Sequence, residues 1–235
     1  MEQKNRFKLV AFDLDGTICN TLSDIASSLN RALKALGFST YSDEGVSGLI
    51  GKSIVYMCKN AVPQDRFEAW TDVRDGFLSD YAEHLCDTTV PYPEMPEMLR
   101  ALKNRGITLA VVTNKPDPHA KKMIRTLFPE DGLFARVQGQ CADYPVKPDP
   151  TMLDVVRGSL GFSRVRPLLL ALFPVDPARV ILGLYAENAP VIHHNMIDLA
   201  ALAIDHDHHI IDDPLAALFI PSENQPDQRF PQFSL

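Results

Sequence analysis

The chain has 235 residues, of which 46% are apolar and 23% are charged, and its net charge at pH 7 is −7. These fractions are typical of a folded globular protein with room for one large domain, or for a core with a smaller insertion. The acidic balance argues against nucleic acids and anionic membranes as partners. Widely spaced cysteines without a C-x-x-C pair, and no apolar run of signal or membrane-spanning length, predict a reduced, cytoplasmic protein.

The most informative stretch lies near the N-terminus, where the apolar residues 9–11 lead into Phe12-Asp13-Leu14-Asp15-Gly16-Thr17. A short apolar run of this kind predicts a strand buried on both faces. Asp13 and Asp15 lie two residues apart, so both point the same way if the strand geometry persists. Two such carboxylates suit covalent phosphoryl chemistry, in which one attacks phosphorus, the other moves a proton and Mg²⁺ neutralises the charge. The alternative is a strand end with two surface acids.

Strands and helices alternate through much of the remaining chain. The apolar spacing predicts helix 21–36, helical segments over 42–85, a linker at 88–96, helix 97–105, strand 107–112, helix 120–127, strand 134–138 and helix 151–160. This order predicts an α/β fold with a Rossmann-like, doubly wound parallel sheet, whose ligands lie at the carboxyl ends of the strands. Residues 1–20 and 90–220 then form the core, 21–89 an inserted helical cap and 221–235 a C-terminal tail.

Two later stretches carry side chains suited to phosphate. Thr113 and Asn114 follow the second strand as Asp13 follows the first, and a hydroxyl with backbone N–H groups at such a turn suits phosphate oxygens. An ordinary helix N-cap is the alternative. Lys147 precedes a helix start and would supply a fixed positive charge, although a single lysine is often only solvated.

Taken together, Asp13-Leu14-Asp15-Gly16-Thr17, Val112-Thr113-Asn114 and Lys147-Pro148-Asp149-Pro150 resemble the haloacid dehalogenase superfamily, and its phosphoglycolate-phosphatase-like branch in particular. The resemblance extends over residues 7–160. It implies a Rossmann-like core and a Mg²⁺-dependent phosphatase that acts on a small-molecule phosphate ester.

The resemblance also implies a role for each matching residue. Asp13 would be the nucleophile and Asp15 the general acid and base, with the Asp15 backbone carbonyl also on the metal. Thr113 would hold phosphate, and Lys147 would stabilise the anionic intermediate. The residues expected to contact substrate are Asn114, Gly16, Thr17 and Lys52, the last in a stretch where such caps present a specificity loop. A solvated lysine is the alternative at Lys52.

The resemblance fails at a fourth motif, Gly-Asp-x-x-x-Asp, whose acids complete the Mg²⁺ site. If residues 179–183 are the strand of this motif, Leu184 and Asn188 occupy the acid positions. If residues 168–173 are the strand, Leu172 replaces the first acid and Asp176 remains as the second, and Asp176 is our third metal ligand. Either way, a leucine stands where a metal ligand is needed, and leucine cannot coordinate Mg²⁺.

Compensating frameshifts over residues 162–205 are one hypothesis for this loss, because the chain rejoins the family pattern at 209–214. A genuine divergence is the alternative. Five histidines near the C-terminus lie with several aspartates and suggest a transition-metal cluster, or else the family's terminal strand and turn; they are His193, His194, His206, His208 and His209. Of these, His206 and His208 alternate with acids.

The leading interpretation is a phosphomonoesterase that forms an aspartyl phosphate, with phosphoglycolate as the first candidate substrate. We expect a monomer or homodimer that binds neither nucleic acid nor membrane. Two alternatives stay open: a catalytically impaired homologue that acts by binding, and a sugar-phosphate mutase that uses the same aspartates.

Overall fold

The computed structural model describes residues 8–162 and three strands beyond them, at 168–171, 179–184 and 195–198. Its main sheet contains β1 (Leu9–Phe12), β4 (Thr108–Pro116), β5 (Arg136–Gln140), β6 (Leu168–Ala171), β7 (Arg179–Leu184) and β8 (Asn195–Asp198), in the order β5-β4-β1-β6-β7-β8. The first four strands in this order are parallel, which confirms the predicted Rossmann-like core.

The other two strands extend the sheet in a way that the sequence did not predict. β7 runs antiparallel to β6, and β8 runs antiparallel to β7. Only residues 172–178 connect β6 to β7, and a parallel return needs a crossover of about a dozen residues or more. The short connection therefore forces an antiparallel pair.

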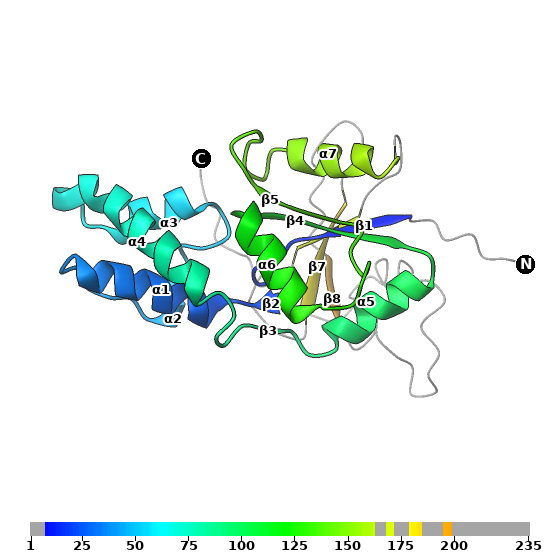
Figure 1. Cartoon of the computed structure of the whole chain (residues 1–235), viewed down its shortest axis with the longest axis horizontal. Coiled ribbons are helices and arrows are strands. Elements are labelled where there is room, and N and C mark those ends of the chain that lie inside the picture. Colours follow the sequence, from blue (N-terminus) through cyan, green and yellow to red (C-terminus); the bar gives the residue numbers. More distant parts are fainter. Residues whose placement is uncertain (1–7, 163–167, 172–178, 185–194, 199–235) are drawn as a thin grey trace, which may run out of the picture.

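The helices are α1 (Leu22–Ala35), α2 (Asp43–Ser47), α3 (Ile54–Ala61), α4 (Trp70–Glu83), α5 (Met95–Asn104), α6 (Asp117–Leu127) and α7 (Thr151–Ser159), with a 3-10 helix η1 (Gln64–Ala69). Figure 1 shows α1 to α4 extending from one end of the sheet. The chain leaves and re-enters the sheet region through β2 (Cys19–Asn20) and β3 (Val90–Pro91), which pair as a small antiparallel sheet. The division into core, cap and tail stays a prediction.

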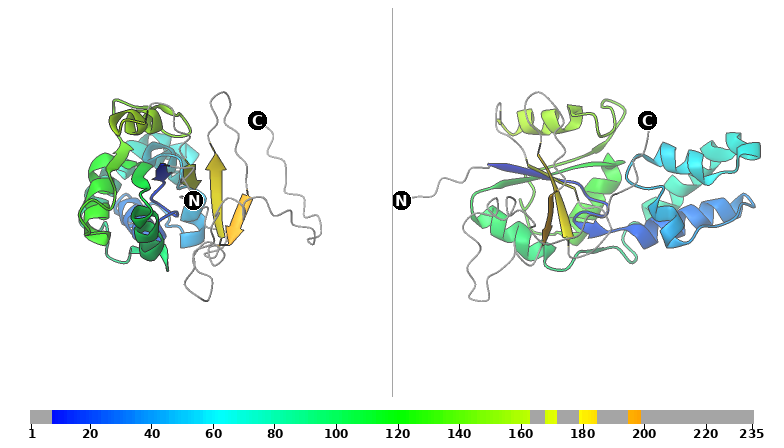
Figure 2. Two further views of the ribbon diagram at one scale, coloured as in Figure 1. Left: turned by 90° about the vertical axis from the view of Figure 1, so that its right-hand side faces the viewer. Right: turned by 180° about the vertical axis from the view of Figure 1, so that it is seen from behind.

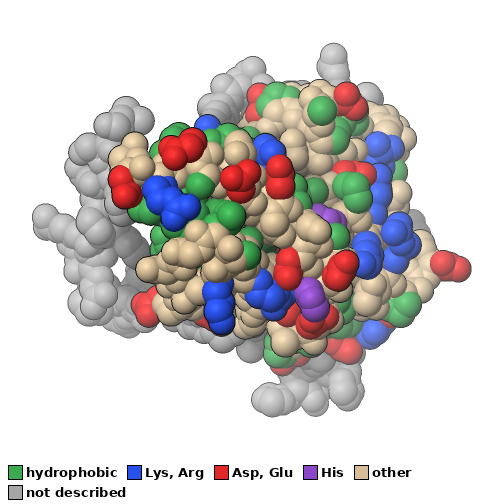
Figure 3. Space-filling view, turned by 60° about the vertical axis from the view of Figure 1, so that its left-hand side comes forward, with side chains coloured by type: hydrophobic (Ala, Val, Ile, Leu, Met, Phe, Trp, Pro, Cys, Tyr) green, Lys and Arg blue, Asp and Glu red, His purple; other side chains and the backbone are tan. Residues whose placement is uncertain are grey.

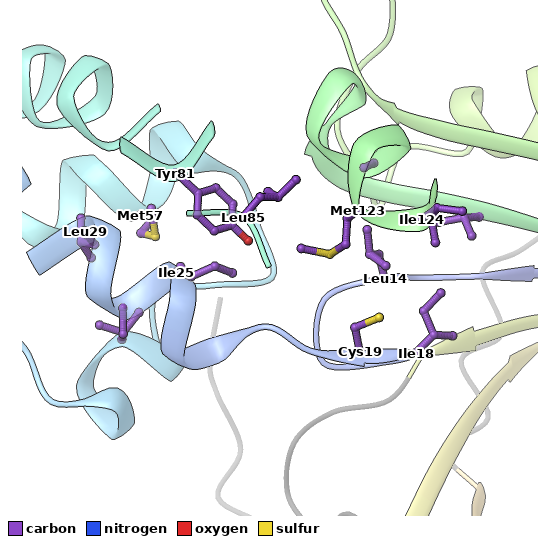
Figure 4. Close-up of a cluster of buried hydrophobic side chains, with 14 of the residues drawn as sticks. Leu14, Ile18, Cys19, Ile25, Leu29, Met57, Tyr81, Leu85, Met123 and Ile124 are labelled. Atoms are coloured by element: carbon purple, nitrogen blue, oxygen red, sulfur yellow. The ribbon is translucent and has the colours of Figure 1, made fainter. Parts of the chain in front are cut away.

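Side chains of β1 alternate between two cores, as expected for a strand covered on both faces. Leu9 and Ala11 pack in a cluster with apolar residues of α7. Val10 and Phe12 belong to a larger cluster with residues of α5 and α6, which continues into the helical region. Figure 2 shows helices on both sides of the sheet, and Figure 4 shows the larger cluster bridging sheet and helical region.

Several boundaries differ from the prediction near the tip of β4. This strand continues to Pro116, which pairs with Gln140 of β5 beyond an irregularity in the register. Gly139 permits the close approach, because a side chain there would collide with the backbone of Asp117. Gly139 N–H also donates to the Asp117 carboxylate at 3.0 Å. The bulged tip is a tertiary effect that the local sequence pattern does not encode.

No helix in the described part of the chain is long and apolar enough to cross a membrane. On the face that Figure 3 presents, acidic and basic side chains are interspersed among apolar and neutral ones.

Asp24, in the first turn of α1, joins the two chain segments that connect the helical region to the sheet. It is only 4% exposed, and its carboxylate accepts hydrogen bonds of 2.5 to 3.1 Å from the backbone N–H and hydroxyl groups of Thr88 and Thr89. Burial alone raises the pKa of Asp24, but these hydrogen bonds outweigh it and hold the pKa below its usual value.

Replacing Asp24 by alanine is expected to lower the free energy of unfolding by about 3 kcal/mol at pH 7, because buried donors lose their acceptor. Since the pKa of Asp24 is lower in the folded chain, its contribution is complete above about pH 4 and disappears as the pH falls through the folded-state value. Urea unfolding of wild type and Asp24→Ala over this pH range measures both effects. The difference between the two free energies of unfolding should narrow as the pH falls.

Asp43→Ala is the matched control, because Asp43 is exposed and accepts a 3.1 Å hydrogen bond from Ser23. Its expected cost is below about 1 kcal/mol. Equal losses in the two variants would contradict the role assigned to Asp24.

Candidate active site

The turn that follows β1 sets the direction of both candidate acids. The carbonyl oxygen of Leu14 accepts hydrogen bonds from the N–H groups of Thr17, Ile18 and Cys19 at 3.1 to 3.2 Å. Gly16, with φ of 71°, adopts the left-handed conformation that glycine allows without strain. The chain therefore reverses directly after Asp15 and leaves both carboxylates at the carboxyl end of β1.

The first carboxylate lies beside a lysine from a distant part of the chain. Asp13 Oδ1 is 2.9 Å from Lys147 Nζ and accepts the N–H of Leu14 at 2.8 Å. Lys147 Nζ also donates to the Val112 carbonyl oxygen at 2.9 Å. The side chains of Asp13 and Lys147 remain 23% and 18% exposed, so the pair is accessible to a ligand.

Asn114 fixes the backbone that carries this lysine. Its side chain accepts the N–H of Lys147 at 2.7 Å and donates to the Lys147 carbonyl oxygen at 3.2 Å. Three stretches that the sequence analysis singled out thus meet at one edge of the sheet, at Asp13, Asn114 and Lys147.

A cleft of about 530 Å³, partly open to solvent, lies between this edge and the helical region. Its lining comprises Asp13, Asp15 and residues 113–116 on the sheet side, and Ile25, residues 50–54, Met57, Phe77 and Tyr81 on the helical side. Thr113 is buried, and its hydroxyl accepts the N–H of Lys115 at 3.2 Å. The cleft therefore combines two carboxylates, a hydroxyl and an amide on the sheet side with a mostly apolar helical side that also carries Lys52, Ser53 and Tyr81.

The second carboxylate has a lysine of its own. Lys115 Nζ lies 2.8 Å from Asp15 Oδ1 and 2.6 Å from the Tyr81 hydroxyl. Burial by itself lowers the pKa of Lys115, but the Asp15 carboxylate and the Tyr81 hydroxyl outweigh it, and the pKa of Lys115 is raised. Lys115 therefore stays charged although its side chain is only 2% exposed.

The remaining candidates lie in different environments. Lys52 is exposed at the cleft wall, and its Nζ lies 4.2 Å from the centroid of the Tyr56 ring. Gly16 and Thr17 form the turn after Asp15 and are not among the lining residues. Their assignment to substrate binding stays a prediction.

Strand directions distinguish the two placements of the fourth motif. β6 is parallel to β1, with Leu170 beside Phe12, so the carboxyl end of β6 reaches the edge where Asp13 lies. β7 is antiparallel, and its last residue, Leu184, pairs with Leu168 at the start of β6. Leu184 therefore lies at the opposite edge of the sheet, which favours β6 as the strand of the fourth motif.

Asp13 and Asp15 supply oxygen ligands of the kind that Mg²⁺ prefers, at one edge of the sheet. Within the described residues, no group of three His, Cys, Asp or Glu side chains forms a metal site. Leu172, Asp176 and Asn188, the histidines of the predicted cluster and the tail at 221–235 lie outside the described residues.

Sequence reasoning did not assign Tyr81 or Lys115 to the site, although both line the cleft. Lys115 stands two positions after Thr113 in β4, so strand alternation already placed both side chains on one face. Tyr81 had no comparable signal, because an aromatic residue on a helix is usually core. Met57 and Phe77 are buried and also form part of the wall of the cleft.

Comparison with known proteins agrees with this geometry. The family model described as haloacid dehalogenase-like hydrolase matches residues 10–168. A phosphoglycolate phosphatase of Haemophilus influenzae is 34% identical over 195 residues, which is 80% of this chain and 85% of that protein. A phosphoglycolate phosphatase of Mannheimia succiniciproducens is 34% identical over 165 residues, 67% of this chain and 73% of that one.

The crystal structure of a predicted phosphoglycolate phosphatase from Haemophilus somnus superposes with a TM-score of 0.60 at 33% identity, covering 67% of this chain and 73% of that chain. The chain therefore belongs to the haloacid dehalogenase-like hydrolases, in the phosphatase branch that contains these phosphoglycolate phosphatases.

Proposed function

We propose that this hydrolase cleaves the phosphate monoester of a small metabolite through an aspartyl-phosphate intermediate on Asp13. The observation that carries the proposal is the pairing of Asp13 with Lys147 at 2.9 Å, together with Thr113 and Asn114, which line the same cleft as Asp13. A nucleophilic carboxylate, a fixed cation and two phosphate-binding groups are the parts that phosphoryl transfer needs.

In the first step, an oxygen of Asp13 bonds to phosphorus as the bond from phosphorus to the leaving oxygen breaks. Asp15 gives its proton to that oxygen, and the alcohol leaves. In the second step, water attacks the phosphorus of the aspartyl phosphate and Asp15 takes a proton from it. The bond between Asp13 and phosphorus breaks, and inorganic phosphate is released with Asp13 regenerated.

Lys147, Thr113 and Asn114 hold the charge that builds up on the phosphoryl oxygens. The lysine contributes a full positive charge, while the hydroxyl and amide contribute hydrogen bonds. Mg²⁺ would add charge neutralisation, held by the Asp13 carboxylate, the Asp15 carbonyl oxygen and Asp176. The assignment of Asp176 as one of these Mg²⁺ ligands stays a prediction.

Phosphoglycolate is the first substrate that we propose, following the relatives at 34% identity. Lys52 at the cleft wall would meet its carboxylate. The alternative of a sugar-phosphate mutase is less favoured, because the relatives that match this chain at 34% identity are phosphoglycolate phosphatases.

Phosphate release from phosphoglycolate, p-nitrophenyl phosphate and a hexose phosphate, each with and without Mg²⁺, tests the proposal. We expect Mg²⁺-dependent release, with the highest kcat/KM for phosphoglycolate. No release by the folded protein would favour the catalytically impaired homologue. Interconversion of hexose-phosphate isomers without phosphate release would instead establish the mutase.

A further inference from the structure

Lys115 is a buried cation, and the stability of the fold does not explain why a lysine is present there. Its side chain is 2% exposed and reaches two groups, Asp15 Oδ1 at 2.8 Å and the Tyr81 hydroxyl at 2.6 Å. Transferring an ammonium group out of water is costly, and a buried ion pair seldom stabilises more than apolar residues of the same volume. A methionine would fill the same space without that cost, so a role in the site accounts better for the lysine.

Tyr81 is fixed as firmly as the lysine that it contacts. Its ring is buried, stacks on Phe77 with centroids 5.1 Å apart, and lies nearly perpendicular to the His119 ring with centroids 5.8 Å apart. Tyr81 belongs to α4 of the helical region, and Figure 4 shows its hydroxyl directed toward the sheet side of the cluster. The hydroxyl therefore holds Lys115 Nζ from the side opposite the sheet.

The two carboxylates of the site are held by separate lysines. Asp13 is paired with Lys147, and Asp15 with Lys115. Lys147 is partly accessible and can turn to a phosphoryl group, whereas Lys115 is enclosed and has its Nζ taken up by Asp15 and Tyr81. Lys115 is thus suited to orienting Asp15 rather than to contacting a substrate.

We propose that Lys115 and Tyr81 are positioning residues that hold the Asp15 carboxylate in the orientation from which it takes a proton from the attacking water. This inference rests on the proposed function. Since Lys115 lies on β4 and Tyr81 on α4, the orientation of Asp15 depends on the seating of α4 against the sheet.

Steady-state and burst kinetics with p-nitrophenyl phosphate test the proposal in Lys115→Met. The leaving group of this substrate, p-nitrophenolate, departs without a proton. The value of kcat/KM therefore reports phosphoryl transfer to Asp13 and should stay within about twofold of wild type. Hydrolysis of the aspartyl phosphate needs an oriented Asp15, so kcat should fall about 10- to 100-fold, since a displacement of about 1 Å can cost 10²-fold. KM should fall in parallel, and a burst of p-nitrophenolate equal to the enzyme concentration should appear.

Tyr81→Phe keeps the ring and removes one hydrogen bond. It should give the same pattern with a decrease in kcat of about three- to tenfold. Lys122→Met is the matched control, because Lys122 Nζ donates to the Ala82 carbonyl of α4 at 2.7 Å without touching Asp15. Its kcat and KM should equal those of wild type.

Equal decreases in kcat and kcat/KM in Lys115→Met would indicate a merely structural role and overturn the proposal, as would unchanged kcat in both variants. If thermal unfolding shows that Lys115→Met does not fold, Tyr81→Phe decides alone, and an unchanged kcat overturns it. A wild type that releases no p-nitrophenolate would be a different result, which refutes the proposed function and this inference with it.

Discussion

Replacing Asp13 by asparagine is expected to abolish phosphate release while leaving the fold intact. An amide oxygen is too weak a nucleophile to attack phosphorus, so the aspartyl phosphate cannot form. Loss of a nucleophile that acts in concert with its neighbours typically costs on the order of 10⁴-fold or more in kcat, which is about 5 kcal/mol of transition-state stabilisation. Phosphate release from phosphoglycolate and p-nitrophenyl phosphate in the presence of Mg²⁺ measures the effect.

The stability of Asp13→Asn should change by less than about 1 kcal/mol, because its ion pair with Lys147 is partly exposed and the amide still accepts a hydrogen bond. Asp131→Asn makes the same chemical change at an exposed position away from the cleft and should keep full activity. An Asp13→Asn protein that turns over at the wild-type rate would rule out Asp13 as the nucleophile.

Introducing an aspartate at position 172 is expected to strengthen Mg²⁺ binding. β6 ends at Ala171, at the edge of the sheet that carries Asp13, and residue 172 comes next in the chain. A further carboxylate adds negative charge and an oxygen ligand, so the Mg²⁺ concentration for half-maximal activity should fall about tenfold or more, and kcat should rise. Calorimetric titration with Mg²⁺ measures the binding independently of turnover.

Leu184→Asp is the control for this experiment, since it makes the same substitution at the other candidate position. Leu184 pairs with Leu168 at the opposite end of β6, so a carboxylate there should leave Mg²⁺ binding unchanged. Tighter Mg²⁺ binding in Leu184→Asp, and none in Leu172→Asp, would reverse the placement of the fourth motif.

The parts of the site that lie within single strands and turns could be predicted from the sequence. The apolar run before Asp13 forms β1 as expected, whereas Thr113 and Asn114, which were expected to follow the second strand, lie inside β4, which continues to Pro116. Since the carboxyl ends of parallel strands meet at one edge, predicting the sheet also predicted that Asp13 and Thr113 would line the same cleft.

Contacts between distant segments could not be predicted in this way. Lys115 is 100 residues from Asp15 and 34 from Tyr81, and no periodicity links such positions. The direction of β7 is also set by the length of its connection to β6 rather than by its own apolar residues. The choice between β6 and β7 as the strand of the fourth motif therefore required the pairing of these strands in the sheet.

The hydrogen bonds between Asp24 and the Thr88–Thr89 pair have a mechanical consequence. Here the outgoing and returning segments are bonded to each other, both through this carboxylate and through the pairing of β2 with β3. Any displacement of the helical region that separates these two segments must therefore break a buried hydrogen bond of Asp24 or the pairing of β2 with β3.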